Sequence, residues 1–98
     1  MTVKVEYWFH SDGTVGSKFW RNEEGRAHRE DGPAYEYSIG RKFWYKNGLS
    51  HREDGPAIIW ENGVHEYYLS DVSFLKKDYW EKIEEIKKER IKKGKEEK

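Results

Sequence analysis

The 98-residue chain has no cysteine, equal numbers of acidic and basic residues, and only 35% hydrophobic residues against 39% charged ones. These values exclude a disulfide framework, a thiolate nucleophile and a cysteine-bound zinc, and they leave room for one domain with a modest core. Aromatic residues make up 16% of the chain, so we expect rings to provide most of the buried area. No apolar run approaches the ~20 residues that cross a bilayer, and no signal peptide is evident. We therefore expect a soluble, cytoplasmic protein without a membrane partner.

Residues 3–9 alternate between apolar and other side chains, with valines, Tyr7 and Phe9 on one face and Lys4, Glu6, Trp8 and His10 on the other. This period of two predicts a β-strand. Asn-Gly pairs at residues 47–48 and 62–63 favour tight hairpin turns, since both positions tolerate positive φ. Together with aromatic, β-prone segments, these turns predict an antiparallel meander of about six short strands within residues 1–70. Beyond the first strand, its strands are expected at residues 17–21, 35–37, 41–46, 58–60 and 64–69.

The composition shifts sharply after Leu69, where charged residues begin to dominate. Ser73 is a candidate N-cap for a helix over residues 74–91. We assign residues 71–93 to a C-terminal amphipathic helix packed in part on the sheet, and residues 94–98 to a charged tail that is too polar to bury. The predicted fold class is mainly β (α+β) in a single domain. One helix face is expected to hold Leu75, Tyr79, Ile83, Ile86 and Arg90.

The segment His-Arg-Glu-Asp-Gly-Pro-Ala occurs at residues 28–34 and recurs without change at residues 51–57, an offset of 23. Lys-Phe-Trp at residues 18–20 recurs at residues 42–44, an offset of 24. A seven-residue identity at this spacing identifies an internal repeat of about two and a half units.

This pattern resembles the MORN-like β-hairpin repeats of small proteins from phages, giant viruses and bacteria, some of which are associated with antitoxins. The resemblance covers residues 1–70 and rests mainly on the His-Arg-Glu-Asp-Gly-Pro-Ala motif. It implies a sheet extended hairpin by hairpin, and it implies no established activity. The small number of repeats and the long charged helix depart from the usual pattern.

The repeated loops offer two interpretations. His28 with Asp31, and His51 with Asp54, could orient an imidazole for acid–base chemistry or hold a metal. A structural role is favoured, because a residue set repeated identically suits a task performed once per hairpin. In that role Asp-Gly-Pro makes a turn with its glycine at an unusual φ, and the arginine pairs with a loop carboxylate or stacks on a tryptophan. We therefore expect no enzyme, no cofactor and no metal site.

The body of the chain, residues 1–75, holds nine basic and twelve acidic residues, which weakens the case for nucleic-acid binding. We expect a non-catalytic protein-binding module, for which the MORN-like resemblance implies a phage or mobile-element origin. We expect it to act in the bacterial cytoplasm as a stoichiometric inhibitor of a host protein such as a defence nuclease, for example a CRISPR nuclease. Exposed rings beside arginines would carry the binding; the candidates are Trp20, Arg21, Arg41, Trp44 and Tyr67.

The alternative function is binding of a small ligand or single-stranded nucleic acid by the repeated loops, with interleaved rings available for base stacking. A homodimer is also compatible with the sequence, since the strand at residues 3–9 leaves an open edge. The loop residues that would serve the alternative are His28, Arg29, Asp31, His51, Arg52 and Asp54.

Overall fold

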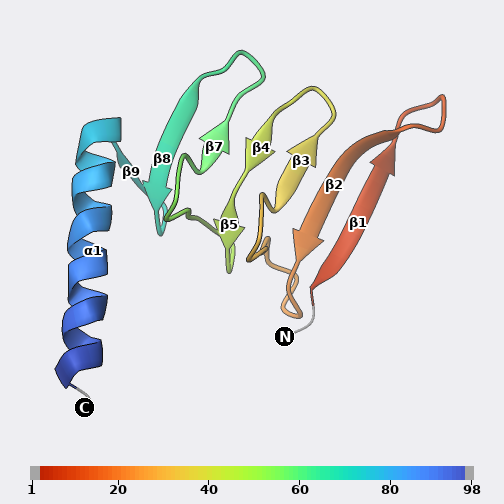
Figure 1. The fold of residues 1–98 in the computed structure, drawn as a ribbon. Coiled ribbons are helices and arrows are strands. Elements are labelled where there is room, and N and C mark those ends of the chain that lie inside the picture. The colour runs from red at the N-terminus through yellow and green to blue at the C-terminus, as the bar shows by residue number, and fades with distance from the viewer. Residues whose placement is uncertain (1–2, 97–98) are drawn as a thin grey trace.

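The computed structural model describes residues 3–96, which form one antiparallel sheet, a separate two-stranded hairpin and a terminal helix (Figure 1). Seven strands follow one another in the sheet in the order β1-β2-β3-β4-β7-β8-β9, and β5 pairs with β6 beside them. The predicted antiparallel meander followed by a helix is confirmed. The elements are β1 Lys4–Phe9, β2 Val15–Arg21, β3 Tyr35–Tyr37, β4 Lys42–Phe43, β5 Tyr45–Lys46, β6 Leu49–Ser50, β7 Ile58–Ile59, β8 His65–Leu69, β9 Val72–Phe74 and α1 Lys76–Glu96.

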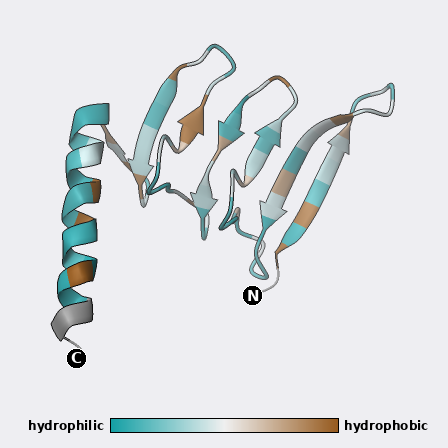
Figure 2. Ribbon diagram, in the orientation of Figure 1, coloured by the Kyte–Doolittle hydropathy of each residue, from teal (hydrophilic) through white to brown (hydrophobic). Residues whose placement is uncertain are grey.

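The sheet is one layer thick, and the helix lies at one end of it beside β8 and β9 (Figure 1). The molecule measures 56 × 32 × 16 Å along its principal axes. Within residues 3–96 no second sheet covers the strands and the one helix lies at the end of the sheet, so the core is small and sits where the helix meets the sheet. Tyr67 and Leu69 of β8 pack there against Tyr79 and Ile83 of α1. The helix α1 is mostly hydrophilic with a few hydrophobic bands (Figure 2), and its buried residues Tyr79 and Ile83 pack against β8.

The helix begins later than the sequence predicts. Ser73, the expected N-cap, lies in β9, and the first helical hydrogen bond runs from the Tyr79 N–H to the Leu75 carbonyl at 2.9 Å. Leu75 is 76% exposed and does not join the packed face, whereas Tyr79 and Ile83 are buried. At its far end α1 continues through Glu96, into the segment predicted as a charged tail, while residues 97–98 lie outside the described residues.

The late start of the helix follows from a second copy of the β5–β6 hairpin turn. The β5–β6 turn has Asn47 at φ 50° and Gly48 at φ 81°. At the same offset of 23, the β8–β9 turn has Ser70 at φ 49° and Asp71 at φ 67°. Two successive residues at positive φ make the type of turn that matches the twist of a hairpin. The chain therefore completes this hairpin first, and α1 starts where a third His-Arg-Glu-Asp loop would stand.

Candidate functional site

The strand register sorts the side chains onto two faces of the sheet. Phe19, Tyr35 and Phe43 lie opposite one another across β2, β3 and β4, so they share one face, which we call the ring face. Lys18 and Glu36 form the neighbouring pair, next to Phe19 and Tyr35 in their strands, and point to the opposite face. We call that opposite face the loop face, because the two His-Arg-Glu-Asp-Gly-Pro-Ala loops fold over it.

Six aromatic rings follow one another along the ring face, with neighbouring centroids 4.8–6.3 Å apart and most pairs edge-to-face. Such pairs are more favourable than the burial of their area alone would give. All six rings are only half-buried. Trp8 extends the row onto β1, where it is 62% exposed and 6.4 Å from Phe19. The six rings are Phe19, Tyr35, Tyr37, Phe43, Tyr45 and Trp60.

Two arginines lie over these rings. The Arg21 guanidinium is 5.6 Å from the centre of Tyr35, and the Arg41 guanidinium is 5.7 Å from Tyr37 and 5.1 Å from Trp60. Cations are attracted to the faces of aromatic rings at these distances. The ring face therefore combines aromatic surface with fixed positive charge.

Each of these arginines is held by a carboxylate. Arg21 Nε donates to Glu6 at 3.0 Å, and Arg41 donates to both oxygens of Glu61, at 2.9 and 2.8 Å. The hydrogen bonds from Arg41 lower the pKa of Glu61 to about 2, and the same contact raises the pKa of Arg41. Because the Arg41–Glu61 contact is bidentate, the guanidinium plane is fixed in orientation.

On the loop face, the first repeated loop is fixed by its arginine. The Arg29 guanidinium stacks on Trp20 at 3.9 Å from the ring centre. It donates from Nε to Asp31 at 3.0 Å and from Nη1 to the Pro33 carbonyl at 3.1 Å. The expectation that this arginine pairs with a carboxylate or stacks on a tryptophan is confirmed on both counts.

The second loop repeats the arrangement closely. Arg52 stacks on Trp44 at 4.0 Å and donates to Asp54 at 2.8 Å and to the Pro56 carbonyl at 3.0 Å. One partner is added from the helix: the Tyr79 hydroxyl donates to the Arg52 carbonyl. The helix thus binds the second loop through the loop's own backbone.

The glycine of each loop serves a purpose other than the predicted one. Gly32 and Gly55 do not have positive φ, so the expectation of an unusual backbone conformation is wrong. A Cβ on Gly32 would stand 3.0 Å from Arg29 Cζ, and one on Gly55 would stand 2.9 Å from Arg52 Cζ. The guanidinium packs directly against the glycine backbone, so any larger residue there would force the arginine to shift.

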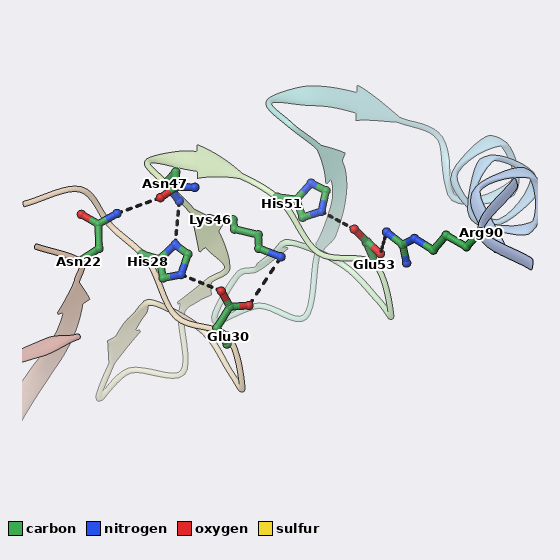
Figure 3. Close-up of polar contacts among 8 residues, drawn as sticks. All are labelled: Asn22, His28, Glu30, Lys46, Asn47, His51, Glu53 and Arg90. Atoms are coloured by element: carbon green, nitrogen blue, oxygen red, sulfur yellow. Dashed lines mark hydrogen bonds and ion pairs between the residues drawn. The ribbon is translucent and has the colours of Figure 1, made fainter. Parts of the chain in front are cut away.

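The histidines pair with glutamates and not with the predicted aspartates, which are taken by the arginines. His28 Nε2 lies 2.9 Å from Glu30, and His51 Nε2 lies 2.9 Å from Glu53 (Figure 3). On the other side of each ring, Nδ1 accepts a turn amide, from Asn47 at 2.9 Å for His28 and from residue 70 at 3.0 Å for His51. An Nδ1 that accepts must be unprotonated, so Nε2 carries the proton and donates to the carboxylate. Both ring nitrogens are therefore occupied: Nδ1 holds the loop to the next hairpin turn, and Nε2 binds a carboxylate of the same loop.

A cleft of about 800 Å³ lies between the two loops and the helix. Its walls carry both signs of charge, and most of these charges are paired within the protein. Arg90 of α1 reaches Glu53 at 2.7 Å, and Lys46 lies 3.6 Å from Glu30 (Figure 3). Burial alone would raise the pKa of Glu53, but hydrogen bonds from His51 and Arg90 outweigh it and hold that pKa below its ordinary value. The alternative ligand loops meet at this cleft, although His28 is buried beside it.

The five residues predicted to bind a protein partner do not form one surface. Arg21 and Arg41 lie on the ring face, whereas Trp20 and Trp44 lie on the loop face, half-buried beneath arginines. Tyr67 is 8% exposed in the core, so the expectation of an exposed ring there is wrong. The helix covers the loop-face side of β8, which sequence alternation alone does not reveal. Alternation does separate Trp20 from Arg21, since neighbours in a strand point to opposite faces.

Within residues 3–96, no three histidine or acidic side chains converge in a way that could hold a metal ion. No helix in this part of the chain is long and apolar enough to span a membrane. In comparisons with known proteins, no family model matched the chain, and neither curated proteins nor solved structures gave a match.

Proposed function

We propose that this protein is a non-catalytic protein-binding module whose ring face is the contact surface. The observation that carries the proposal is the continuous row of half-exposed rings with Arg21 and Arg41 fixed over it. Tyrosine, tryptophan and arginine are the residue types that dominate interface energies. A partner covering this row would bury aromatic area while finding the arginines already ordered, which reduces the entropy lost on binding.

The module acts, in this proposal, as a stoichiometric inhibitor of a host protein such as a CRISPR nuclease, in the bacterial cytoplasm and in the service of a phage or mobile element. The resemblance of the repeated loops to MORN-like repeats supports that origin. The occupied histidines support a role without catalysis, because neither ring nitrogen of His28 or His51 is free to act as a base.

The alternative, a small ligand or single-stranded nucleic acid in the loop-face cleft, has the cleft volume in its favour. The charges there weigh against it. Arg29, Arg52 and Arg90 each have a carboxylate partner already, so a phosphate would have to displace an existing ion pair.

The test is a pull-down from bacterial lysate with the tagged chain, with and without nuclease, followed by mass spectrometry. Arg41→Ala on the ring face has a matched control in Lys42→Ala, the next residue, which points to the loop face. We expect one protein captured at near-equal stoichiometry after nuclease treatment. Arg41→Ala and Tyr37→Ala should each weaken its binding by about tenfold or more, as hot-spot residues do, and Lys42→Ala should not.

Inhibition is then tested by adding increasing amounts of this chain to the purified partner and measuring the partner's activity. The activity should reach its minimum when one equivalent of the chain has been added. Equal effects of Arg41→Ala and Lys42→Ala would refute the ring face as the contact surface. Recovery of nucleic acid alone, lost on Arg52→Ala in a chain that still folds, would favour the alternative.

A further inference from the structure

The two ends of the sheet are finished differently. At one end, α1 packs on β8, and two of its side chains contact the second loop: the Tyr79 hydroxyl binds the Arg52 carbonyl and Arg90 pairs with Glu53. At the other end, β2 is the only neighbour of β1 within residues 3–96, and all six residues of β1 are exposed. Repeat sheets need a capping element at each end, and an uncovered edge strand is a template for another strand.

The backbone groups that β1 offers at this edge can be assigned. The Trp20 N–H donates to the Ala34 carbonyl at 2.7 Å, and the Trp20 carbonyl accepts the His28 N–H at 3.0 Å, so Trp20 turns both groups away from β1. Val5 lies opposite Trp20. In an antiparallel pair such a residue also turns its N–H and C=O outward. Val5 and Tyr7, two residues further on, therefore present their N–H and C=O groups at the open edge.

We propose that a second copy of this chain binds there, with the two β1 strands antiparallel and Val5 opposite Val5 of the second copy. A two-fold axis normal to the sheet keeps the two faces of the sheet continuous across the dimer, so paired residues must lie on the same face. The axis must therefore pass through a residue pair and cannot pass between two residues. When the axis passes through Val5, Lys4 of each copy lies opposite Glu6 of the other, which gives two such pairs in the dimer. Centring on Glu6 would set two carboxylates against each other, and centring on Tyr7 would set Glu6 against Trp8.

The surroundings of Lys4 in the single chain also favour this register. Lys4 lies directly across from Arg21, a residue of the same charge, and it has no ion pair among the described residues. Glu6 contacts Arg21 at 3.0 Å. In the dimer, each Lys4 gains the carboxylate that the single chain does not give it, and opposite charges across a strand pair are stabilising. The proposal does not depend on the ring-face function.

The test is sedimentation equilibrium of the full chain, whose mass is 11.8 kDa. Wild type should sediment with twice that mass. Val5→Pro removes the edge N–H without removing a β1–β2 hydrogen bond, and proline is tolerated where the N–H faces solvent, so this variant should be monomeric with unchanged far-ultraviolet circular dichroism. Val5→Ala, which keeps the N–H, is the matched control and should remain dimeric.

Charge reversal tests the register. Lys4→Glu or Glu6→Lys alone turns two attractive cross-strand pairs into two repulsive ones and should raise the dimer Kd by roughly tenfold or more. The double variant Lys4→Glu, Glu6→Lys should restore the dimer. A monomeric wild type at high concentration, or a dimer that survives Val5→Pro, would overturn the proposal. A double variant as weak as either single one would overturn this register.

Discussion

The Tyr79 hydroxyl makes a specific prediction about how the helix stabilises the sheet. This side chain is fully buried, and burial raises its pKa above the ordinary value. Its hydroxyl donates to the Arg52 carbonyl and accepts the Gly55 N–H at 3.2 Å. In Tyr79→Phe the ring remains and both backbone groups lose their partner, the Gly55 N–H in a buried position and the Arg52 carbonyl in a half-buried one.

Leaving a buried polar group without a partner costs about 1–3 kcal/mol, so Tyr79→Phe should lower the free energy of unfolding by roughly 2–4 kcal/mol. For a domain of this length, each kcal/mol lowers Tm by about 4–8 °C. We therefore expect a fall in Tm of at least about 8 °C in thermal unfolding followed by circular dichroism. Hydrogen exchange at the Gly55 amide should accelerate, because that amide loses its acceptor.

Tyr67→Phe is the matched control. Tyr67 packs 4.8 Å from Tyr79 in the same core, and its hydroxyl has no hydrogen bond to any described residue. Its removal should change stability by no more than about 0.5 kcal/mol. Equal melting temperatures for the two variants, with the Gly55 amide still protected, would refute the idea that the helix holds the second loop through this hydroxyl.

Three further predictions concern the loop, the core and the ring face. Gly55→Ala should destabilise the fold by about 1 kcal/mol or more, since its Cβ must displace the Arg52 guanidinium; adding Arg52→Ala should remove most of the extra cost in a double-mutant cycle. Ile83→Ala should cost about 2–5 kcal/mol in urea unfolding, because this side chain is 2% exposed in the core. The pKa of Glu61, about 2 against an ordinary 4.5, should rise toward the ordinary value in Arg41→Ala, as an NMR titration would measure. Since the folded pKa is the lower one, the stability that this ion pair contributes is present above pH 4.5 and is lost as the pH falls toward 2.

Each of these has an outcome that contradicts it. Additive effects of Gly55→Ala and Arg52→Ala would mean that the guanidinium is not what excludes a Cβ. A loss below about 1 kcal/mol for Ile83→Ala would show that the helix is not docked on β8. An unchanged Glu61 pKa in Arg41→Ala would show that the bidentate contact is absent in solution.

The parts of the fold that depend on neighbours along the chain could be predicted from the sequence. Alternation in residues 3–9 gave β1, and the Asn-Gly pairs at residues 47–48 and 62–63 marked two turns. The hydrogen bonds of the loop arginines to their own loop were also predictable, because Arg29 donates to Asp31 and to the Pro33 carbonyl, two and four residues further along the chain. Such features follow from local backbone sterics and short-range hydrogen bonding, which the sequence determines by itself.

Only the tertiary structure decided which surfaces are covered. Tyr67 is buried because α1 crosses the loop-face side of β8, and the six rings stay half-exposed because no layer covers the other face. The start of α1 at Lys76, and not after Ser73, depended on β9 pairing with β8. The His28 ring is held by the Asn47 N–H, which lies 19 residues further along the chain. Burial and pairing of this kind are set by contacts between segments far apart in the chain, so a residue's own neighbours in the sequence do not determine them.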